Sequence, residues 1–330
     1  MTAHAIAIPQ KRKRSISKDA VWAGMLLFCM LLLLKNAADA VTFAREGLLL
    51  CAKSVIPSLF PFMVLSELAI SSGISDALPR SVSAPLQKLL GISPVACTAL
   101  ILGLLCGFPV GARCLSSAYK KGLLSKSECE HVLLFCNIPS AAYLINTLGK
   151  TIWNNKGFGI LLYVSSLLVA LLAGVLCNPD RKKKERSQPT EIPLFRTAQP
   201  KGALLLTDAV GAASKSMLLV CAYVVFFSTL VGTLNGCMER YGIPDAVGAA
   251  LFCLFELSGG VWRASMLPHR IQGMILSAFA CGWAGLSVHF QIRGVCAECD
   301  FSFRKYHLSK LIQGIALALI TLVWCALDTV

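Results

Sequence analysis

Charged residues are scarce in this chain. Asp, Glu, Lys and Arg make up 15% of its 330 residues, and only 17 of them are acidic. Soluble globular domains carry about a quarter charged residues, so an ordinary soluble domain is excluded. Hydrophobic residues instead account for 56% of the chain. This composition predicts a protein whose surface faces lipid.

The sequence also lacks common catalytic and nucleotide-binding motifs. It contains no HExxH zinc motif and no GxxxxGK[ST] phosphate-binding loop. CAEC, with Cys296 and Cys299, has metal-ligand spacing, but a structural zinc site needs four ligands. Two reduced thiols are therefore the favoured interpretation of this pair. We predict that the chain is not an enzyme and uses neither a metal nor a cofactor.

Long apolar runs are abundant. The clearest, at 157–177, would rise about 31 Å as a helix, which is enough to cross the hydrocarbon core. Two runs, at about 92–117 and 243–266, contain helix-breaking residues and are predicted to be re-entrant hairpins. We predict an all-α polytopic integral membrane protein with these two hairpins in an inverted repeat. About seven spanning helices complete it, near 20–40, 55–72, 129–148, 157–177, 209–235, 270–290 and 309–327.

Most cations lie between the apolar runs. The net charge is +14, and two basic tracts occur at 11–14 and 181–186. Because loops rich in Lys and Arg stay in the cytoplasm, we predict a multi-pass protein of the cell membrane with a cytoplasmic N-terminus. The cations are not interleaved with aromatic residues, so nucleic acid is not an expected partner.

Five segments follow from these patterns, and two of them resemble each other. LLCGFPVGAR, which contains Arg113, corresponds in the second half to FELSGGVWR, which contains Arg263. FCNIPSAAYLINTLG likewise corresponds to ACGWAGLSVHFQIRG. Inverted repeats of this kind are common in secondary transporters, whose broken helices meet at the substrate site. We predict a basic N-terminus, a first transmembrane anchor, a first repeat, a basic cytoplasmic linker and a second repeat, at 1–19, 20–41, 42–177, 178–206 and 207–330.

Polar and helix-breaking residues in the two repeats are the candidates for a solute-binding site. Backbone groups freed where a helix ends inside the membrane are tolerated only where they line a cavity. The set comprises Gly107, Phe108, Pro109, Gly111, Asn137, Asn146, Glu256, Ser258, Gly259, Gly260, Arg263, Ser287, His289 and Gln291. Residues 287, 289 and 291 do not share one helical face, so at most two of them point inward.

Glu256 has two interpretations of about equal weight. A carboxylate inside the membrane is costly, so it can mark a cation, proton or hydroxyl-binding site. It can equally form a structural ion pair with Arg263 or Lys215, because buried charges need partners. For Arg113 the favoured interpretation is a side chain that reaches the membrane interface, beside Lys120 and Lys121. Glu67, near the end of a span, is expected to be interfacial.

Four motifs carry a resemblance to a known family. PSLFPFMVLSEL, CGFPVGAR, LLFCNIPSAAY and GLSVHFQI resemble the YlbJ-type sporulation integral membrane proteins, in the group with nucleoside recognition (Gate) domains. The resemblance implies a role in endospore formation and a fold through which small solutes pass. The chain departs from the family pattern at Phe108, Ile138 and Ala142, so the family's detailed ligand chemistry is not carried over to this chain.

Two functions remain open. The first is a transporter or permease for a small polar solute, possibly nucleoside-like, needed for the spore cortex or envelope. The alternative is a non-transporting membrane factor that organises spore-envelope assembly. The expected partners are membrane lipids, the unidentified solute, and either further copies of the chain or other spore-envelope membrane proteins.

Overall fold

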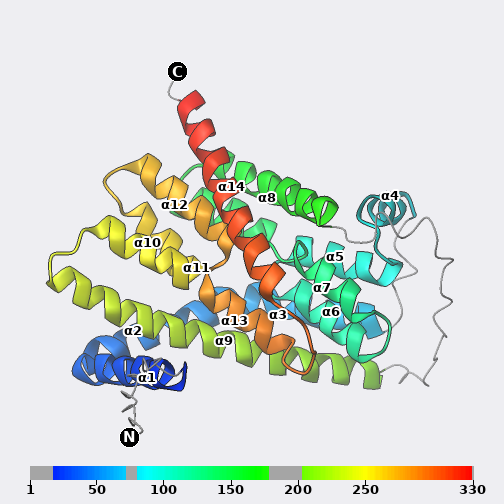
Figure 1. Ribbon diagram of the computed structural model, residues 1–330, viewed down its shortest axis with the longest axis horizontal. Helices are drawn as coiled ribbons and strands as arrows, with labels where there is room; N and C mark the ends of the chain where they lie inside the picture. The colour runs from blue at the N-terminus through cyan, green and yellow to red at the C-terminus, as the bar shows by residue number, and fades with distance from the viewer. Residues whose placement is uncertain (1–17, 72–79, 178–202, 329–330) are drawn as a thin grey trace, which may run out of the picture.

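The computed structural model describes residues 18–71, 80–177 and 203–328, and every regular element in these ranges is a helix. Figure 1 shows the long helix α9 (Ala203–Arg240) along one side of the molecule, with α14 (Arg304–Asp328) crossing the bundle and extending beyond it. The predicted all-α fold is confirmed. The basic tracts at 11–14 and 181–186 lie outside the described residues.

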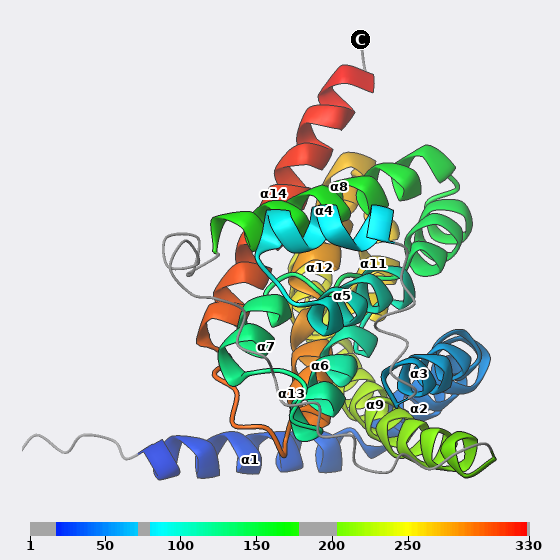
Figure 2. The same cartoon turned by 90° about the vertical axis from the view of Figure 1, so that its right-hand side faces the viewer.

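The N-terminal helices are bent rather than straight. Two adjoining helices, one up to Lys35 and one from Ala37, meet at 97°. The side-chain amide of Asn36, between them, donates to the carbonyl of Leu32 at 2.8 Å. Figure 2 shows the first of these helices away from the main body, so the segment predicted to span at 20–40 is broken near residue 36. The elements are α1 (Lys18–Lys35), α2 (Ala37–Leu50), the π-helical turn η1 (Cys51–Val55) and α3 (Ile56–Ser71).

The first interrupted run folds into a helical hairpin. After α4 (Arg80–Leu90), the hydroxyl of Ser93 caps α5 (Pro94–Cys106), and the chain turns back into α6 (Val110–Lys120). Gly107 has φ +83°, a conformation that favours glycine. The two arms lie very close, because a Cβ added to Gly103 would be 2.8 Å from the Cα of Gly111.

The second interrupted run forms a matching hairpin. Here α10 (Asp245–Phe255) ends at Glu256, whose backbone is extended with φ −140° and ψ 127°, and α11 (Leu257–Ser265) follows at once. A Cβ added to Gly260 would lie 2.7 Å from the Cα of Cys253. Both predicted hairpins are therefore present in the fold.

A second broken helix crosses the tip of each hairpin. In the first half, α7 (Lys126–Leu133) and η3 (Ala142–Ile152) are separated by an irregular segment, and its Ile138 carbonyl accepts from the Phe108 N–H at 3.1 Å. In the second half, α12 (Arg270–Trp283) and α13 (Gly285–Val295) are separated by a break, and a Cβ on Gly285 would lie 3.2 Å from the Glu256 and Leu257 nitrogens. The continuous span predicted at 129–148 is wrong, because this second broken helix replaces it.

The contacts between loops match the predicted topology. The loops at 121–126 and 296–303, both predicted to be cytoplasmic, meet through Lys126 and Asp300 at 2.6 Å. The loops at 153–155 and 266–270, both predicted to be external, meet where Arg270 donates to the Trp153 carbonyl at 3.0 Å. Because α12 and α13 lead from one loop cluster to the other, the two hairpins open at opposite ends of this pair, as an inverted repeat requires.

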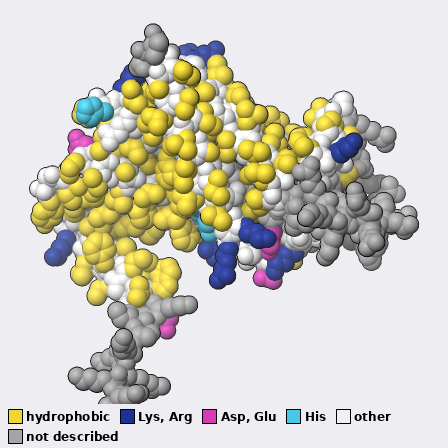
Figure 3. All heavy atoms as spheres, turned by 45° about the horizontal axis from the view of Figure 1, so that its top comes forward, with side chains coloured by type: hydrophobic (Ala, Val, Ile, Leu, Met, Phe, Trp, Pro, Cys, Tyr) yellow, Lys and Arg dark blue, Asp and Glu magenta, His cyan; other side chains and the backbone are white. Residues whose placement is uncertain are grey.

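The membrane character of the fold is confirmed, and the candidate spans are fewer than the number predicted. Among the described residues, four helices are long and apolar enough to cross a membrane, or up to six if each sharply bent pair is one span. About seven spanning helices were predicted. The difference arises at helix breaks, where one apolar run becomes two helices. On the face in Figure 3, hydrophobic side chains cover most of the surface, and Lys and Arg gather near its margins.

Candidate functional site

A cavity of about 850 Å³ lies where the two hairpin tips approach each other. Its walls come from α2, η1, α3, the tip of the first hairpin, η3, α9, both arms of the second hairpin and α13. This volume is within the range of small-molecule sites, roughly 300–1,000 Å³. The predicted site residues that line it are Gly107, Phe108, Glu256, Ser258, Gly259, Arg263 and Gln291.

The other predicted residues support the cavity or lie away from it. The Asn137 side-chain oxygen accepts from the Ala112 N–H at 3.1 Å, which ties the irregular segment to α6. Gly111 and Gly260 lie at close approaches inside their hairpins, where a side chain would collide with neighbouring backbone atoms. Asn146 is exposed outside the cavity. Pro109 is also outside the lining, as are Ser287 and His289 on α13.

The polar residues of α13 do not all point toward the cavity, as the helical spacing predicts. Gln291 lines the cavity and donates to the Ser287 hydroxyl at 3.3 Å, one turn earlier. The ring of His289 points elsewhere, because its Nδ1 lies 3.0 Å from the Tyr306 hydroxyl on α14. His289 therefore joins two helices and does not reach the cavity.

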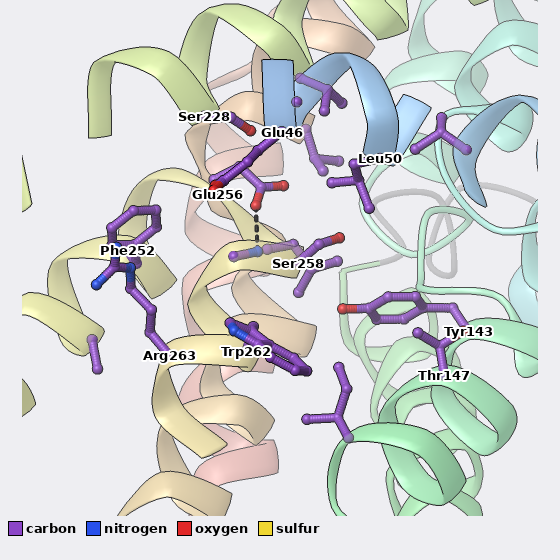
Figure 4. Close-up of a pocket in the computed structure, with 18 of the residues that line it drawn as sticks. Glu46, Leu50, Tyr143, Thr147, Ser228, Phe252, Glu256, Ser258, Trp262 and Arg263 are labelled. Atoms are coloured by element: carbon purple, nitrogen blue, oxygen red, sulfur yellow. Dashed lines mark hydrogen bonds between the residues drawn. The ribbon is translucent and has the colours of Figure 1, made fainter. Parts of the chain in front are cut away.

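Glu256 occupies the centre of the second hairpin tip. Its side chain is buried, and the carboxylate oxygen Oε2 accepts from the Gly259 N–H at 2.5 Å, capping the start of α11. Figure 4 shows this carboxylate close to Ser258, with Tyr143 on the opposite side of the cavity.

The ion pair that was one of the two interpretations of Glu256 is not formed among the described residues. Arg263 instead reaches Glu239 on α9, with Nη1 2.9 Å from Oε1. The Arg263 guanidinium also lies 4.4 Å from the centre of the Phe252 ring, a favourable cation–π contact. Lys215 is exposed on α9 and interacts electrostatically with Glu298. The cavity therefore holds a buried carboxylate that neither predicted cation neutralises.

Arg113 is buried and paired, contrary to its expected position at the interface. Its Nη2 lies 3.0 Å from Glu67 Oε2, and the Ser117 hydroxyl donates to the other oxygen of Glu67 at 3.0 Å. Lys121 approaches the same carboxylate from the exposed side at 3.4 Å. This cluster joins α3 to the second arm of the first hairpin.

Sequence reasoning missed the buried Lys310 on α14. Its ammonium donates to the Asn137 carbonyl at 2.7 Å and to the Gln313 side-chain oxygen at 2.9 Å. Gln313 and Ser309 in turn donate to the Leu134 carbonyl. These side chains bind carbonyls that the irregular segment leaves without helical partners. The available signal was the cluster of Ser, Lys and Gln on the first turns of an apolar helix.

Tyr143 and Thr147 were also missed. Both lie on η3, and Figure 4 shows them facing the cavity across from Ser258 and Trp262. The hydroxyl of Tyr143 is buried and interacts with Ser258. Predicting this pair required knowing that η3 packs beside the second hairpin.

The two cysteines of the CAEC motif pack against α6. The thiol of Cys296 lies 3.7 Å from the Ala112 carbonyl, and that of Cys299 lies 3.2 Å from the Ser116 hydroxyl. In the part of the chain that the structure describes, no group of three or more His, Cys, Asp or Glu residues is placed to hold a metal ion.

The comparisons with known proteins give one relative. The chain is 24% identical over 339 residues to the sporulation integral membrane protein YlbJ of Bacillus subtilis (strain 168), covering 93% of this chain and 83% of that protein. No family profile and no solved structure matches it. The resemblance to the YlbJ-type proteins is thereby confirmed over nearly the whole chain, whereas the Gate-domain assignment stays a prediction.

Proposed function

We propose that this chain is a sporulation-associated integral membrane protein that carries a small polar solute across the cell membrane, at a step needed for the spore cortex or envelope. The role in sporulation is supported by the likeness to YlbJ. The transport role is supported by one observation above all: the cavity of about 850 Å³ lies between two helical hairpins that open at opposite ends of the bundle.

The chemistry of the cavity wall suits a small solute with both apolar and polar parts. Phe108, Tyr143 and Trp262 offer ring surfaces, while Ser258, Gln291 and Glu256 offer hydrogen-bonding groups. Broken helices place backbone N–H and C=O groups at the same point, and such groups bind substrates in many secondary transporters. A nucleoside-like solute is compatible with this wall.

A membrane factor that only organises other proteins would not need such a cavity. A cavity of this size in an apolar bundle costs packing and leaves the polar groups on its wall to be satisfied. We therefore rank transport above the organising role. A cytoplasmic N-terminus, contact with lipids and association with further copies or other spore-envelope proteins complete the proposal.

The test is solute uptake by the full-length protein in liposomes, with nucleosides and divalent-metal chelates as the first solutes. Ser258→Trp places a large ring inside the cavity, and Leu168→Trp places the same ring on the exposed face of α8 (Lys156–Leu176). We expect uptake by the unaltered protein and by Leu168→Trp, and its loss in Ser258→Trp. Equal uptake by both variants, or no flux of any solute, would favour the organising role.

The biological role is tested separately by deleting the gene. A strain without the protein is expected to form spores with reduced heat resistance. Normal spores would contradict the sporulation role while leaving the liposome result unaffected.

A further inference from the structure

The carboxylate of Glu256 is held in two opposing ways. The first turn of α11 donates backbone N–H groups toward it, and a helix N-terminus stabilises a negative charge. The residue is only 4% exposed, and burial away from water makes a negative charge costly. Because these two effects oppose each other, a change in water access at the cavity shifts the balance between the charged and neutral forms.

Among the described residues, no cation is paired with this carboxylate. In the part of the chain that the structure describes, no lysine or arginine forms an ion pair with Glu256, since Arg263 is paired with Glu239. Structural carboxylates buried in a membrane protein are normally paired. Glu67 illustrates this alternative, because its carboxylate bonds to Arg113 and Ser117. Glu67 faces the Arg113 guanidinium, whereas Glu256 faces the cavity.

Apart from Arg263, which is paired with Glu239, the other titratable groups around Glu256 do not supply a positive charge. Those that interact with it electrostatically are Cys51 on η1, Tyr143 on η3 and Cys253 on α10, all neutral in their usual state. The faces of α9 and α13 contribute neutral Ser228 and Gln291. The remaining charged groups of the cavity wall are Glu46 on α2, Glu239 on α9, Asp245 on α10 and Arg263 on α11.

A proton suits this position better than a metal ion. Calcium takes about six to eight oxygen ligands, and magnesium needs near-octahedral oxygen coordination. One side of the Glu256 carboxylate faces backbone N–H donors, which repel a metal ion. The neighbours Phe252, Cys253 and Leu257 supply no side-chain oxygen, and Ser228, Tyr143 and Ser258 on the cavity wall supply only neutral hydroxyls. Among the described residues, no group of three or more His, Cys, Asp or Glu is placed to hold a metal ion. A proton needs only a single carboxylate oxygen.

We infer that Glu256 is the proton-binding site of this protein and that its proton is exchanged with water in the cavity as the solute moves. Protonation adds one proton from that water to a carboxylate oxygen and removes the negative charge. Release returns the proton to water and restores the charge. The purpose of the exchange rests on the proposed transport function, but the existence of the proton site does not.

The direct test is infrared difference spectroscopy of the full-length protein between about pH 5 and about pH 8, a range above the usual titration of exposed glutamates. We expect a protonated-carboxyl band that changes across this range, that is lost in Glu256→Gln and that is kept in Glu46→Gln. Glu46 is the matched control, because it lines the same cavity but is exposed. A band unchanged by Glu256→Gln would overturn the inference and leave Glu256 as a fixed helix cap.

A second measurement needs no variant. Carbodiimides react with protonated carboxyl groups, and mass spectrometry locates the modified residue. We expect modification of Glu256 that declines as the pH rises; an unmodified Glu256 in a sample whose Glu46 reacts at about pH 5 would overturn the inference. If a solute is found, its uptake should lose its dependence on a pH gradient in Glu256→Gln. Absence of any flux would count against transport, whereas the infrared band would still decide the proton site.

Discussion

The strongest stability prediction concerns the buried ion pair between Glu67 and Arg113. The two side chains are 11% and 6% exposed, and one guanidinium nitrogen lies 3.0 Å from the carboxylate. Glu67→Gln keeps the shape of the side chain but removes its charge, which leaves the Arg113 guanidinium buried without a counter-charge. Breaking one partner of a buried pair costs about 3–5 kcal/mol of the free energy of unfolding. We expect a loss of this size.

Glu239→Gln is the matched control. Its partner Arg263 lies at a nearly identical distance, 2.9 Å, but the side chains of this pair are 28% and 54% exposed. Water solvates such a pair in either state, so the expected loss is about 0–1 kcal/mol. The two substitutions are chemically the same, and burial is the intended difference between them.

The assay is equilibrium unfolding of the purified protein in mixed detergent micelles, with both variants measured beside the unaltered chain. The double variant Glu67→Leu with Arg113→Met removes both charges, and we expect it to recover much of the stability lost in Glu67→Gln. A Glu67→Gln loss below about 1 kcal/mol, or one equal to that of Glu239→Gln, would refute the argument from burial.

Two further substitutions test the supports of the cavity. Gln313→Leu removes hydrogen bonds to the Leu134 carbonyl and to Lys310, and it should lower the free energy of unfolding by about 1–3 kcal/mol. Gln272→Leu, on the exposed surface of α12, is the control and should change that free energy little. Similar losses in the two variants would contradict a specific role for Gln313. Gly103→Ala places a Cβ 2.2 Å from the Cys136 carbonyl and should reduce the yield of folded protein, whereas Gly211→Ala, which meets no atom within 4 Å, should stabilise α9 by up to about 1 kcal/mol. Normal folding of Gly103→Ala, measured by size-exclusion chromatography, would show that the first hairpin is not tightly closed.

The crossing of the broken helices could be predicted only in part. The glycines and the proline of LLCGFPVGAR place a break in the first hairpin, and the match with FELSGGVWR indicates a second one. The break at 134–140 was not predicted, because its sequence has no stronger breaker than a single proline, Pro139. Its carbonyls are bonded by side chains of α14, nearly two hundred residues later in the chain.

The sequence by itself determined the solvent and the general plan of this protein. Scarce charge, long apolar runs and cations between them specify a membrane bundle, and its two hairpins follow from local helix-breaking residues, because both signals are read over a few turns of chain. The tertiary structure decided which charges are paired and where the cavity lies. The burial of Arg113 and Lys310 depends on contacts between helices that are distant in sequence, and so does the absence, among the described residues, of an ion pair to Glu256. Packing alone fixes such contacts, because the local sequence around a cation does not specify its partner. The same side chain can reach the membrane interface, a carboxylate or a backbone carbonyl.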